Sequence, residues 1–379
     1  MKIMMSAGEA SGDMHAAAVA AELKRIMPEA DIFGMGGADM RKSGVRIIYD
    51  IENLGIIGVV EVIRHIPFFF RLRAFLKKAM VEEKPDVLVC VDYPGFNMKL
   101  AHVAKELGIP VIYYIAPTIW AWNKGRAKNI VRDVEQVASI FPFEAEAYRK
   151  AGARVTFVGH PLADTVKPSM SFEEAMKYFH GDPSRKRVLL MPGSRKNEVA
   201  GLLPMMLEAA KRLEEKERCQ FFIPRASTIP KDMLLGIIGN TSLSIEITEG
   251  HQYDLMHICT ACVASSGTAT LETALMELPT VLVYRLAPVT WFLANLLVHV
   301  KYAGLPNLLL NREVTPELLQ DRANADNIVS ILLPWLEDEK KWEKNVEEIR
   351  KVRKALGSGG AVHRVAELII KTAGAVHGK

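Results

Sequence analysis

The sequence predicts an α/β protein built from two Rossmann-like domains, and three observations support this fold class. The chain has 379 residues, which is too long for one typical hydrophobic core. Strand-like and helix-like patterns alternate along most of its length. Small or polar turns follow the strand-like runs. Such alternation is typical of parallel sheets covered by helices on both faces, with ligands bound at the carboxyl ends of the strands.

The composition is that of a globular protein, with 49% hydrophobic and 24% charged residues. The net charge of +4 comes from 48 basic and 44 acidic residues, so it gives no indication of a nucleic-acid partner. Glu9 and Asp13 interrupt the first apolar run, which argues against a signal peptide. We also find no run of about 18 uncharged apolar residues, the length that a membrane-spanning helix needs.

The first half contains the strand-like runs 3–6, 31–33, 45–49, 86–91, 111–115 and 155–158. The first of them leads into the loop AGEASGD, which includes Gly8, Glu9 and Ser11. This loop lacks the G-x-G-x-x-G spacing of a dinucleotide site, so we interpret it as the floor of a ligand cleft. A polar connector then precedes the strand-like runs of the second half, 187–191, 219–223, 243–248 and 262–264.

These patterns predict three segments. Residues 1–165 form an N-terminal Rossmann-like domain, and residues 166–345 form a C-terminal Rossmann-like domain. Residues 346–379 form C-terminal helices that we expect to pack back towards the N-terminal domain. The carboxyl-end loops of the two domains are expected to face each other across a cleft.

The clearest functional pattern runs from Cys262 to Val283, as a strand, a small-residue loop, a helix and a second strand. Ser265, Ser266, Gly267 and Thr268 join the first strand to the helix, where free backbone N–H groups and the helix dipole favour a phosphate or pyrophosphate. Glu272, one turn further on, is placed to accept from a ribose hydroxyl. The alternative is an ordinary turn capped by Ser or Thr.

Three further side chains are candidates for chemistry. Asp92 ends an apolar strand and opens the loop DYPGFN, a setting that suits a general base, although a turn or N-cap carboxylate is the alternative. Arg195, in PGSR, is placed to bind a leaving phosphate, unless it is a surface arginine. Asn307 lies in the apolar loop GLPNLLL, where its amide requires a partner. That partner is either the ligand or the backbone.

The cysteines do not predict a metal centre. They stand at positions 90, 219, 259 and 262, and the Cys259-x-x-Cys262 pair has no second pair to complete a zinc site. The phosphate site predicted at residues 265–268 needs no cofactor. We therefore expect buried free thiols and no metal.

A basic aromatic segment covers residues 62–80, with the sequence VIRHIPFFFRLRAFLKKAM. Phe68, Phe69 and Phe70 stand among basic residues, a pattern typical of helices that lie on anionic lipid. The alternative is a core helix with a solvated basic face. The basic residues are Arg64, Arg71, Arg73, Lys77 and Lys78.

Seven motifs together give the chain a resemblance to the lipid-A-disaccharide synthase family: AGEASGD, VDYPGFN, IAPTIWAW, FVGHPLAD, LMPGSR, ASSGTATLE and GLPNLLL. The resemblance implies an inverting glycosyltransferase of the two-domain GT-B architecture. It implies UDP-2,3-diacylglucosamine as donor and 2,3-diacylglucosamine 1-phosphate as acceptor, joined by a β-1,6 linkage. It also implies Asp92 as catalytic aspartate, with Arg195 and Asn307 on the donor side. Trp122, in the IAPTIWAW run, joins Gly8, Glu9 and Ser11 on the acceptor side.

The chain departs from the family pattern at two points. Gly95 stands where some members have an acidic residue, so a second carboxylate there is not essential, and His160-Pro161 replaces a His-Thr pair. The resemblance implies a cytoplasmic enzyme at the inner membrane of a Gram-negative-type bacterium. It leaves open whether the enzyme is a homodimer. Two other classes stay open from the residues: a UDP-sugar epimerase or hydrolase of the same architecture, and a non-catalytic nucleotide-dependent lipid-binding protein.

Overall fold

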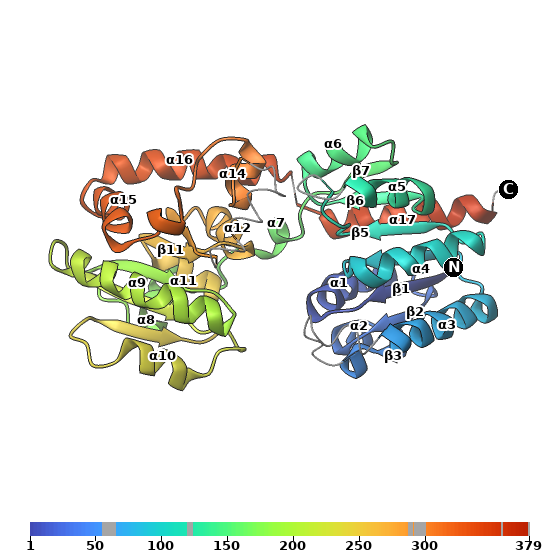
Figure 1. Cartoon of the computed structure of the whole chain (residues 1–379), viewed down its shortest axis with the longest axis horizontal. Helices are drawn as coiled ribbons and strands as arrows, with labels where there is room; N and C mark the ends of the chain where they lie inside the picture. Colours follow the sequence, from blue (N-terminus) through green and yellow to red (C-terminus); the bar gives the residue numbers. More distant parts are fainter. Residues whose placement is uncertain (55–65, 120–123, 287–290, 292–300, 358, 378–379) are drawn as a thin grey trace. The chain divides into compact units, whose positions relative to one another are not determined.

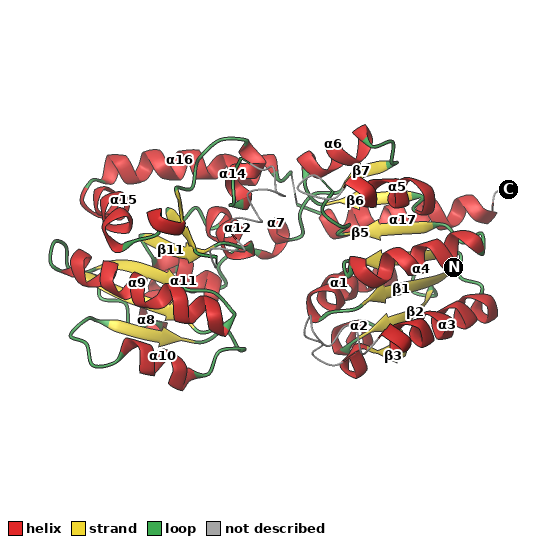
Figure 2. Ribbon diagram, viewed as in Figure 1, coloured by secondary structure: helices red, strands yellow, loops and turns green. Residues whose placement is uncertain are grey.

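The computed structural model describes residues 1–54, 66–119, 124–286, 291, 301–357 and 359–377. The chain divides into two compact units (Figure 1). Unit 1 comprises Met1–Pro161 and Ser358–Lys379, and unit 2 comprises Leu162–Gly357. Each unit is an α/β fold with one parallel sheet (Figure 2).

Unit 1 contains a seven-stranded sheet in the order β3-β2-β1-β4-β5-β6-β7, with every neighbouring pair parallel. Its strands are β1 (Lys2–Ala7), β2 (Asp31–Gly36), β3 (Arg46–Asp50), β4 (Val87–Val91), β5 (Val111–Tyr114), β6 (Gln136–Ser139) and β7 (Val155–Phe157). The helices of this unit are α1 (Ala10–Ile26), α2 (Ala38–Lys42), α3 (Ile66–Glu83), α4 (Pro94–Glu106), α5 (Lys124–Asp133), α6 (Pro142–Lys150) and α17 (Ala361–His377).

Unit 2 contains a six-stranded parallel sheet in the order β10-β9-β8-β11-β12-β13. Its strands are β8 (Lys186–Met191), β9 (Cys219–Pro224), β10 (Ile245–Thr248), β11 (Ala261–Ser265), β12 (Thr280–Tyr284) and β13 (Glu317–Leu319). The helices are α7 (Leu162–Thr165), α8 (Phe172–Tyr178), α9 (Lys196–Glu214), α10 (Lys231–Ile238), α11 (Gln252–Ile258), α12 (Thr268–Leu275), α14 (Leu305–Leu310), α15 (Ala325–Glu337) and α16 (Glu339–Ala355).

The central strands are mostly apolar because both faces of each sheet are covered. Successive residues of β8 point to opposite faces, so Val188 and Leu190 join one buried cluster while Leu189 joins another. The same alternation separates Val263 from Cys262 in β11. A strand buried on both faces therefore reads as a continuous hydrophobic run, which is what made these strands predictable.

Helix α17 is the part of the C-terminal region that belongs to unit 1. It packs on α1 and β4 through a buried stripe that includes Ala361, Val365 and Ile369. The prediction that this return begins at residue 346 is wrong. Residues 346–355 continue α16, which packs on α12, α14 and α15 within unit 2. The boundary between the units also lies at residue 161 rather than 165.

Both sheets share one topological feature that positions the functional residues. In unit 1, β1 pairs with β2 on one side and with β4 on the other; in unit 2, β8 pairs in the same way with β9 and β11. The order of the strands therefore reverses between β1 and β4 and between β8 and β11. Ligands of open α/β sheets bind outside the carboxyl ends of the strands at such switch points.

Candidate active site

Asp92 lies at the switch point of unit 1, directly after β4, and its side chain is half-buried. It is not a helix cap, because Tyr93 is the N-cap of α4 and makes no side-chain capping hydrogen bond. Asp92 and Tyr93 both have left-handed backbone, with φ of 49° and 50°. Two successive non-glycine residues in this region are costly, and such strain is concentrated at functional sites.

Several hydrogen bonds hold the backbone of Asp92 in this conformation. Its carbonyl oxygen accepts from Asn97 Nδ2 at 2.8 Å and from the Tyr113 hydroxyl at 2.9 Å. Its N–H donates to the carbonyl of Tyr114 at 3.1 Å. The sequence analysis did not single out Asn97 or Tyr113, because their contacts with Asp92 depend on how β4, β5 and α4 meet.

Gly8 provides the space that this arrangement requires. A Cβ atom at position 8 would lie 2.1 Å from a ring carbon of Tyr93, so a larger residue would displace that ring. Glu9 and Ser11, at the start of α1, are exposed. The AGEASGD loop thus lies beside Asp92, as expected of a loop after the neighbouring strand. Trp122 lies outside the described residues.

Titratable groups surround Asp92. Burial raises the pKa of Asp92, although the Tyr93 N–H and His15 oppose the shift. Partial burial, followed by the charge of Asp92, raises the pKa of Glu9, and burial lowers that of His15. Burial and the neighbouring His15 lower the pKa of His160 to about 4. A half-buried carboxylate with a raised pKa is a suitable general base.

The first turn of α1 contains Asp13, whose role was not predicted from the sequence. This buried carboxylate accepts from the N–H groups of Gly37 at 2.6 Å, Asp39 at 2.9 Å and Met40 at 3.3 Å. Asp13 therefore caps the start of α2 from α1. Its role is to fix the loop after β2, not to contact a substrate.

The switch point of unit 2 carries a cavity of about 360 Å³. Its walls come from the carboxyl ends of β8, β9 and β11 and the first turn of α12. The structure thus brings together the residues that the sequence places in PGSR and SSGT. The lining residues include Pro192, Gly193, Ser194, Arg195, Glu198, Arg225, Gln252, Ser265, Ser266, Gly267 and Thr268.

The start of α12 has the geometry of an anion site. Gly267 is the N-cap, with φ of 146°, and makes no side-chain capping bond. Only glycine adopts this backbone readily, and it leaves the N–H groups of the first turn to an outside acceptor. Ser266 donates weakly to the Ala303 carbonyl, at 3.4 Å, and Thr270 donates to the Gly267 carbonyl at 2.8 Å. The capped-turn alternative is therefore not supported.

Arg195 and Glu272 differ in how directly they can reach this cavity. Arg195 lines it, its side chain is 78% exposed, and its Nη1 lies 2.8 Å from Glu198 Oε1. Glu272 is not among the lining residues; it accepts from the Tyr253 hydroxyl at 3.0 Å, and burial raises its pKa. Arg225, which the sequence analysis missed, adds a second guanidinium to the wall and pairs with Glu249.

Protein groups occupy the amide of Asn307, which agrees with the alternative of a structural role. Asn307 is 0% exposed. Its Nδ2 donates to the Thr315 carbonyl at 2.6 Å and to Glu317 Oε1 at 2.7 Å, while its Oδ1 accepts from the N–H groups of Val314 at 2.7 Å and Thr315 at 2.9 Å. Glu317 in turn accepts from the N–H of Ala303, next to Ser266. Asn307 therefore organises the loop beside the cavity.

The aromatic segment on α3 divides into buried and exposed parts. Phe68 and Phe69 are half-buried and pack on the core, with ring centroids 6.4 Å from Tyr49 and 6.2 Å from Phe96, respectively. Phe70 is 55% exposed, and the Arg73 guanidinium lies 5.0 Å from its ring centroid. The three rings therefore do not form one exposed patch. Arg71, Lys77 and Lys78 are exposed, and Arg64 lies outside the described residues.

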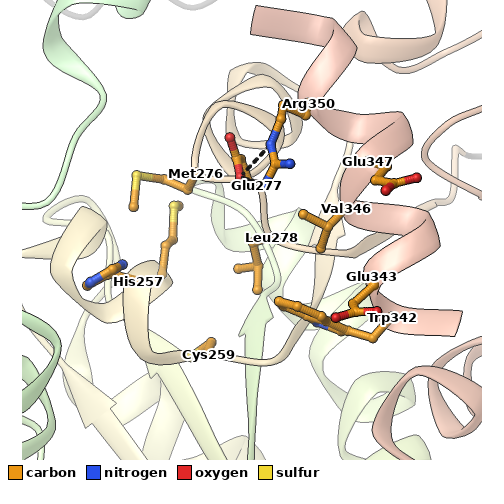
Figure 3. A pocket seen from close by; sticks show the side chains of 11 residues that line it. His257, Cys259, Met276, Glu277, Leu278, Trp342, Glu343, Val346, Glu347 and Arg350 are labelled. Carbon is orange, nitrogen blue, oxygen red and sulfur yellow. Dashed lines mark hydrogen bonds and ion pairs between the residues drawn. The ribbon is translucent and has the colours of Figure 1, made fainter. Parts of the chain in front are cut away.

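Neither a metal centre nor a membrane span is found in the part of the chain that the structure describes. No group of three or more His, Cys, Asp or Glu side chains there could hold a metal ion. Cys259 (Figure 3) and Cys262 are buried free thiols, and burial raises the pKa of Cys259 to about 12. Within the same residues, every helix is too short or too polar to cross a bilayer.

Comparisons with solved structures support the fold. The chain aligns with the UDP-GlcNAc 2-epimerase from Neisseria meningitidis, solved with UDP-GlcNAc, with a TM-score of 0.66 and 13% identity over 98% of this chain and 100% of that one. It aligns with MurG of Acinetobacter baumannii with a TM-score of 0.61 and 16% identity, covering 98% and 99% of the two chains. Epimerases and glycosyltransferases thus share this architecture.

Sequence comparisons are more specific. The lipid-A-disaccharide synthase of Geobacter sulfurreducens is 41% identical over 374 residues, which cover 98% of this chain and 97% of that protein. The synthase of Nitrosococcus oceani is 37% identical over 369 residues, covering 97% and 95%. The family model described as lipid-A-disaccharide synthetase matches residues 3–370. With both switch points inside that match, the chain belongs to the lipid-A-disaccharide synthetase family.

Proposed function

We propose that this chain is a lipid-A-disaccharide synthase. It transfers 2,3-diacylglucosamine from UDP-2,3-diacylglucosamine to 2,3-diacylglucosamine 1-phosphate and releases UDP. The observation that carries the proposal is the half-buried carboxylate of Asp92 at the switch point of unit 1, on a chain that matches this family almost from end to end. The substrates follow from the family; the division of roles follows from the geometry.

Asp92 acts as the general base. A sugar hydroxyl is a poor nucleophile, so a base must take its proton as the bond to the donor anomeric carbon forms. The bond between that carbon and the UDP oxygen breaks in the same step, and attack from the opposite side inverts the configuration. The proton ends on Asp92, whose raised pKa favours its acceptance.

The cavity of unit 2 binds the UDP part of the donor. The pyrophosphate lies at the first turn of α12, where the N–H groups and the helix dipole stabilise the charge that develops on the leaving group. Arg195, which lines the same cavity, adds a guanidinium. Glu272 accepts from the ribose once its bond to Tyr253 is exchanged, and Asn307 contributes indirectly by holding the loop at Ala303.

This arrangement needs no metal ion to stabilise UDP as it leaves. The helix amides and Arg195 supply the positive charge, so an excess of chelator should leave turnover unchanged. Loss of turnover on addition of chelator, with recovery on addition of Mg²⁺, would contradict this part of the proposal.

Both substrates carry acyl chains, so we place the enzyme at the cytoplasmic surface of the inner membrane. Helix α3 makes the contact through Phe70, with Arg71, Lys77 and Lys78 attracting anionic head groups. Each such basic residue contributes about 1 kcal/mol near an anionic surface.

Turnover of the UDP-diacylglucosamine donor with and without the phosphorylated acceptor tests the proposed reaction. A synthase releases UDP only when the acceptor is present, and forms one disaccharide for each UDP. A hydrolase would release UDP without the acceptor, and an epimerase would change the donor without releasing UDP. The solved epimerases of the same fold make these the outcomes that would refute the proposal.

A further inference from the structure

Asn97 contacts the backbone of Asp92, and the proposed reaction gives it no role of its own. Asn97 is 0% exposed and lies in the first turns of α4. Its Nδ2 donates to the carbonyls of Asp92 at 2.8 Å, Ser6 at 3.0 Å and Val91 at 3.2 Å. Its Oδ1 accepts from the Ser6 hydroxyl at 2.7 Å. One side chain thus joins the carboxyl ends of β1 and β4 to the helix that follows.

These hydrogen bonds fix the backbone at Asp92 from two directions. The carbonyl of Asp92 accepts from both Asn97 and Tyr113, so it is fixed from α4 and from β5. The two strained residues, Asp92 and Tyr93, lie between these anchors. Left-handed conformation persists at non-glycine residues only when the surroundings impose it.

We propose that Asn97, together with Tyr113, is a positioning residue that holds the Asp92 carboxylate in the geometry required for proton transfer. The inference rests on the proposed function, in which Asp92 is the base. Asn97 acts only through the backbone of Asp92, because it is fully buried and its amide is occupied by protein partners.

The pH dependence of turnover distinguishes positioning from simple stabilisation. In the intact site, the Tyr93 N–H bonds to the Asp92 carboxylate and lowers its pKa against the larger effect of burial. If a substitution loosens the turn, the hydrogen bond from the Tyr93 N–H to the Asp92 carboxylate is lost. The pKa of Asp92 then rises further, and the acid limb of the kcat profile moves to higher pH. Glu9 and His15 also face Asp92, the Tyr93 phenol faces Glu9, and the substitutions leave all three in place.

The experiment compares kcat, KM and the pH profile of kcat for Asn97→Ala, Tyr113→Phe and a matched control, Tyr148→Phe. Tyr148 is also buried in unit 1, and its hydroxyl also donates to a backbone carbonyl, that of Pro117, at 2.5 Å. We expect Asn97→Ala to lower kcat at least ~10-fold, with KM for the donor within twofold and the acid limb shifted upward. Tyr113→Phe should shift kcat and the limb in the same direction by less, and Tyr148→Phe should match the wild type.

A folded Asn97→Ala variant with wild-type kcat and pH profile would overturn the proposal. So would a loss of kcat that only follows the folded fraction, measured by circular dichroism, without a shift of the limb. If Asn97→Ala does not fold, Tyr113→Phe decides by the same criteria. Asp92→Asn, measured in parallel, separates the two hypotheses. If it loses turnover while the positioning variants behave as wild type, only the positioning role fails, whereas full turnover of Asp92→Asn refutes the base itself.

Discussion

The two switch points occupy equivalent places in their sheets but are built in different ways. In the proposed reaction the key group of unit 1 is a side chain, Asp92, on strained backbone that buried polar residues hold in place. In unit 2 the key groups are backbone N–H groups at a glycine-capped helix start, with Arg195 exposed at the cavity wall. A proton acceptor must be one group in one place, whereas a pyrophosphate is bound by several donors. We therefore expect single substitutions at the unit 1 site to lower kcat, and single substitutions at the unit 2 site to weaken UDP binding.

The largest effect is expected at Asp92. Asp92→Asn preserves the shape of the side chain and removes the proton acceptor, so kcat should fall by ~10²–10⁴-fold. Steady-state assays at saturating donor and acceptor measure kcat directly. Glu9→Gln is the matched control, because it removes a neighbouring exposed carboxylate from the loop after β1, next to the loop of Asp92. Equal losses of kcat in the two variants would show that Asp92 is not the specific base.

Arg195 tests the other half of the comparison. Arg195→Ala should weaken UDP binding by about 1.5–3 kcal/mol, the range for hydrogen bonds to charged groups, as measured by calorimetry. Lys196→Ala removes an exposed charge beside it, outside the cavity wall, and should have little effect. If both variants bind UDP like the wild type, the guanidinium is a surface group and the cavity binds through its backbone alone.

The burial of the Asp92 carboxyl group should also affect the thermal stability of the protein. The folded state raises the pKa of this carboxyl above its unfolded value, so the ionised form destabilises the fold at pH above both values. Asp92→Asn should therefore raise the thermal midpoint at pH 7, where a gain of about 1 kcal/mol corresponds to about 2–4 °C. The gain should shrink as the pH falls through the folded pKa towards the unfolded value of about 3.9. A variant that melts lower than the wild type at pH 7 would indicate that the carboxylate is stabilising.

The smallest change in stability is expected on α3. Phe70→Ser should alter the free energy of unfolding by less than about 0.5 kcal/mol, because the ring is largely exposed, and should weaken binding to anionic vesicles. Phe68→Ser should destabilise the fold instead, because Phe68 packs on the core beside Tyr49. Vesicle sedimentation at two salt concentrations measures binding. Unchanged sedimentation of Phe70→Ser would place the membrane contact elsewhere.

The parts of this site that local sequence determines could be predicted. Asp92 and the SSGT turn each follow a continuous apolar strand, and parallel sheets place such turns at one edge. The roles of Asn97 and Asn307 could not be predicted, because each depends on partners that the fold brings together. Ser6, for example, lies 91 positions from Asn97. The split between Phe68 and Phe70 likewise depends on Tyr49 and Phe96, which decide the face of α3 that is covered.

In the proposed mechanism, the base and the nucleotide site lie at separate switch points, so UDP binding should not depend on the base. Titration of UDP into the Asp92→Asn variant tests it most directly. We expect a UDP dissociation constant within twofold of the wild-type value, in a variant whose turnover is nearly abolished. A UDP affinity that falls together with turnover would contradict the separation of the two sites.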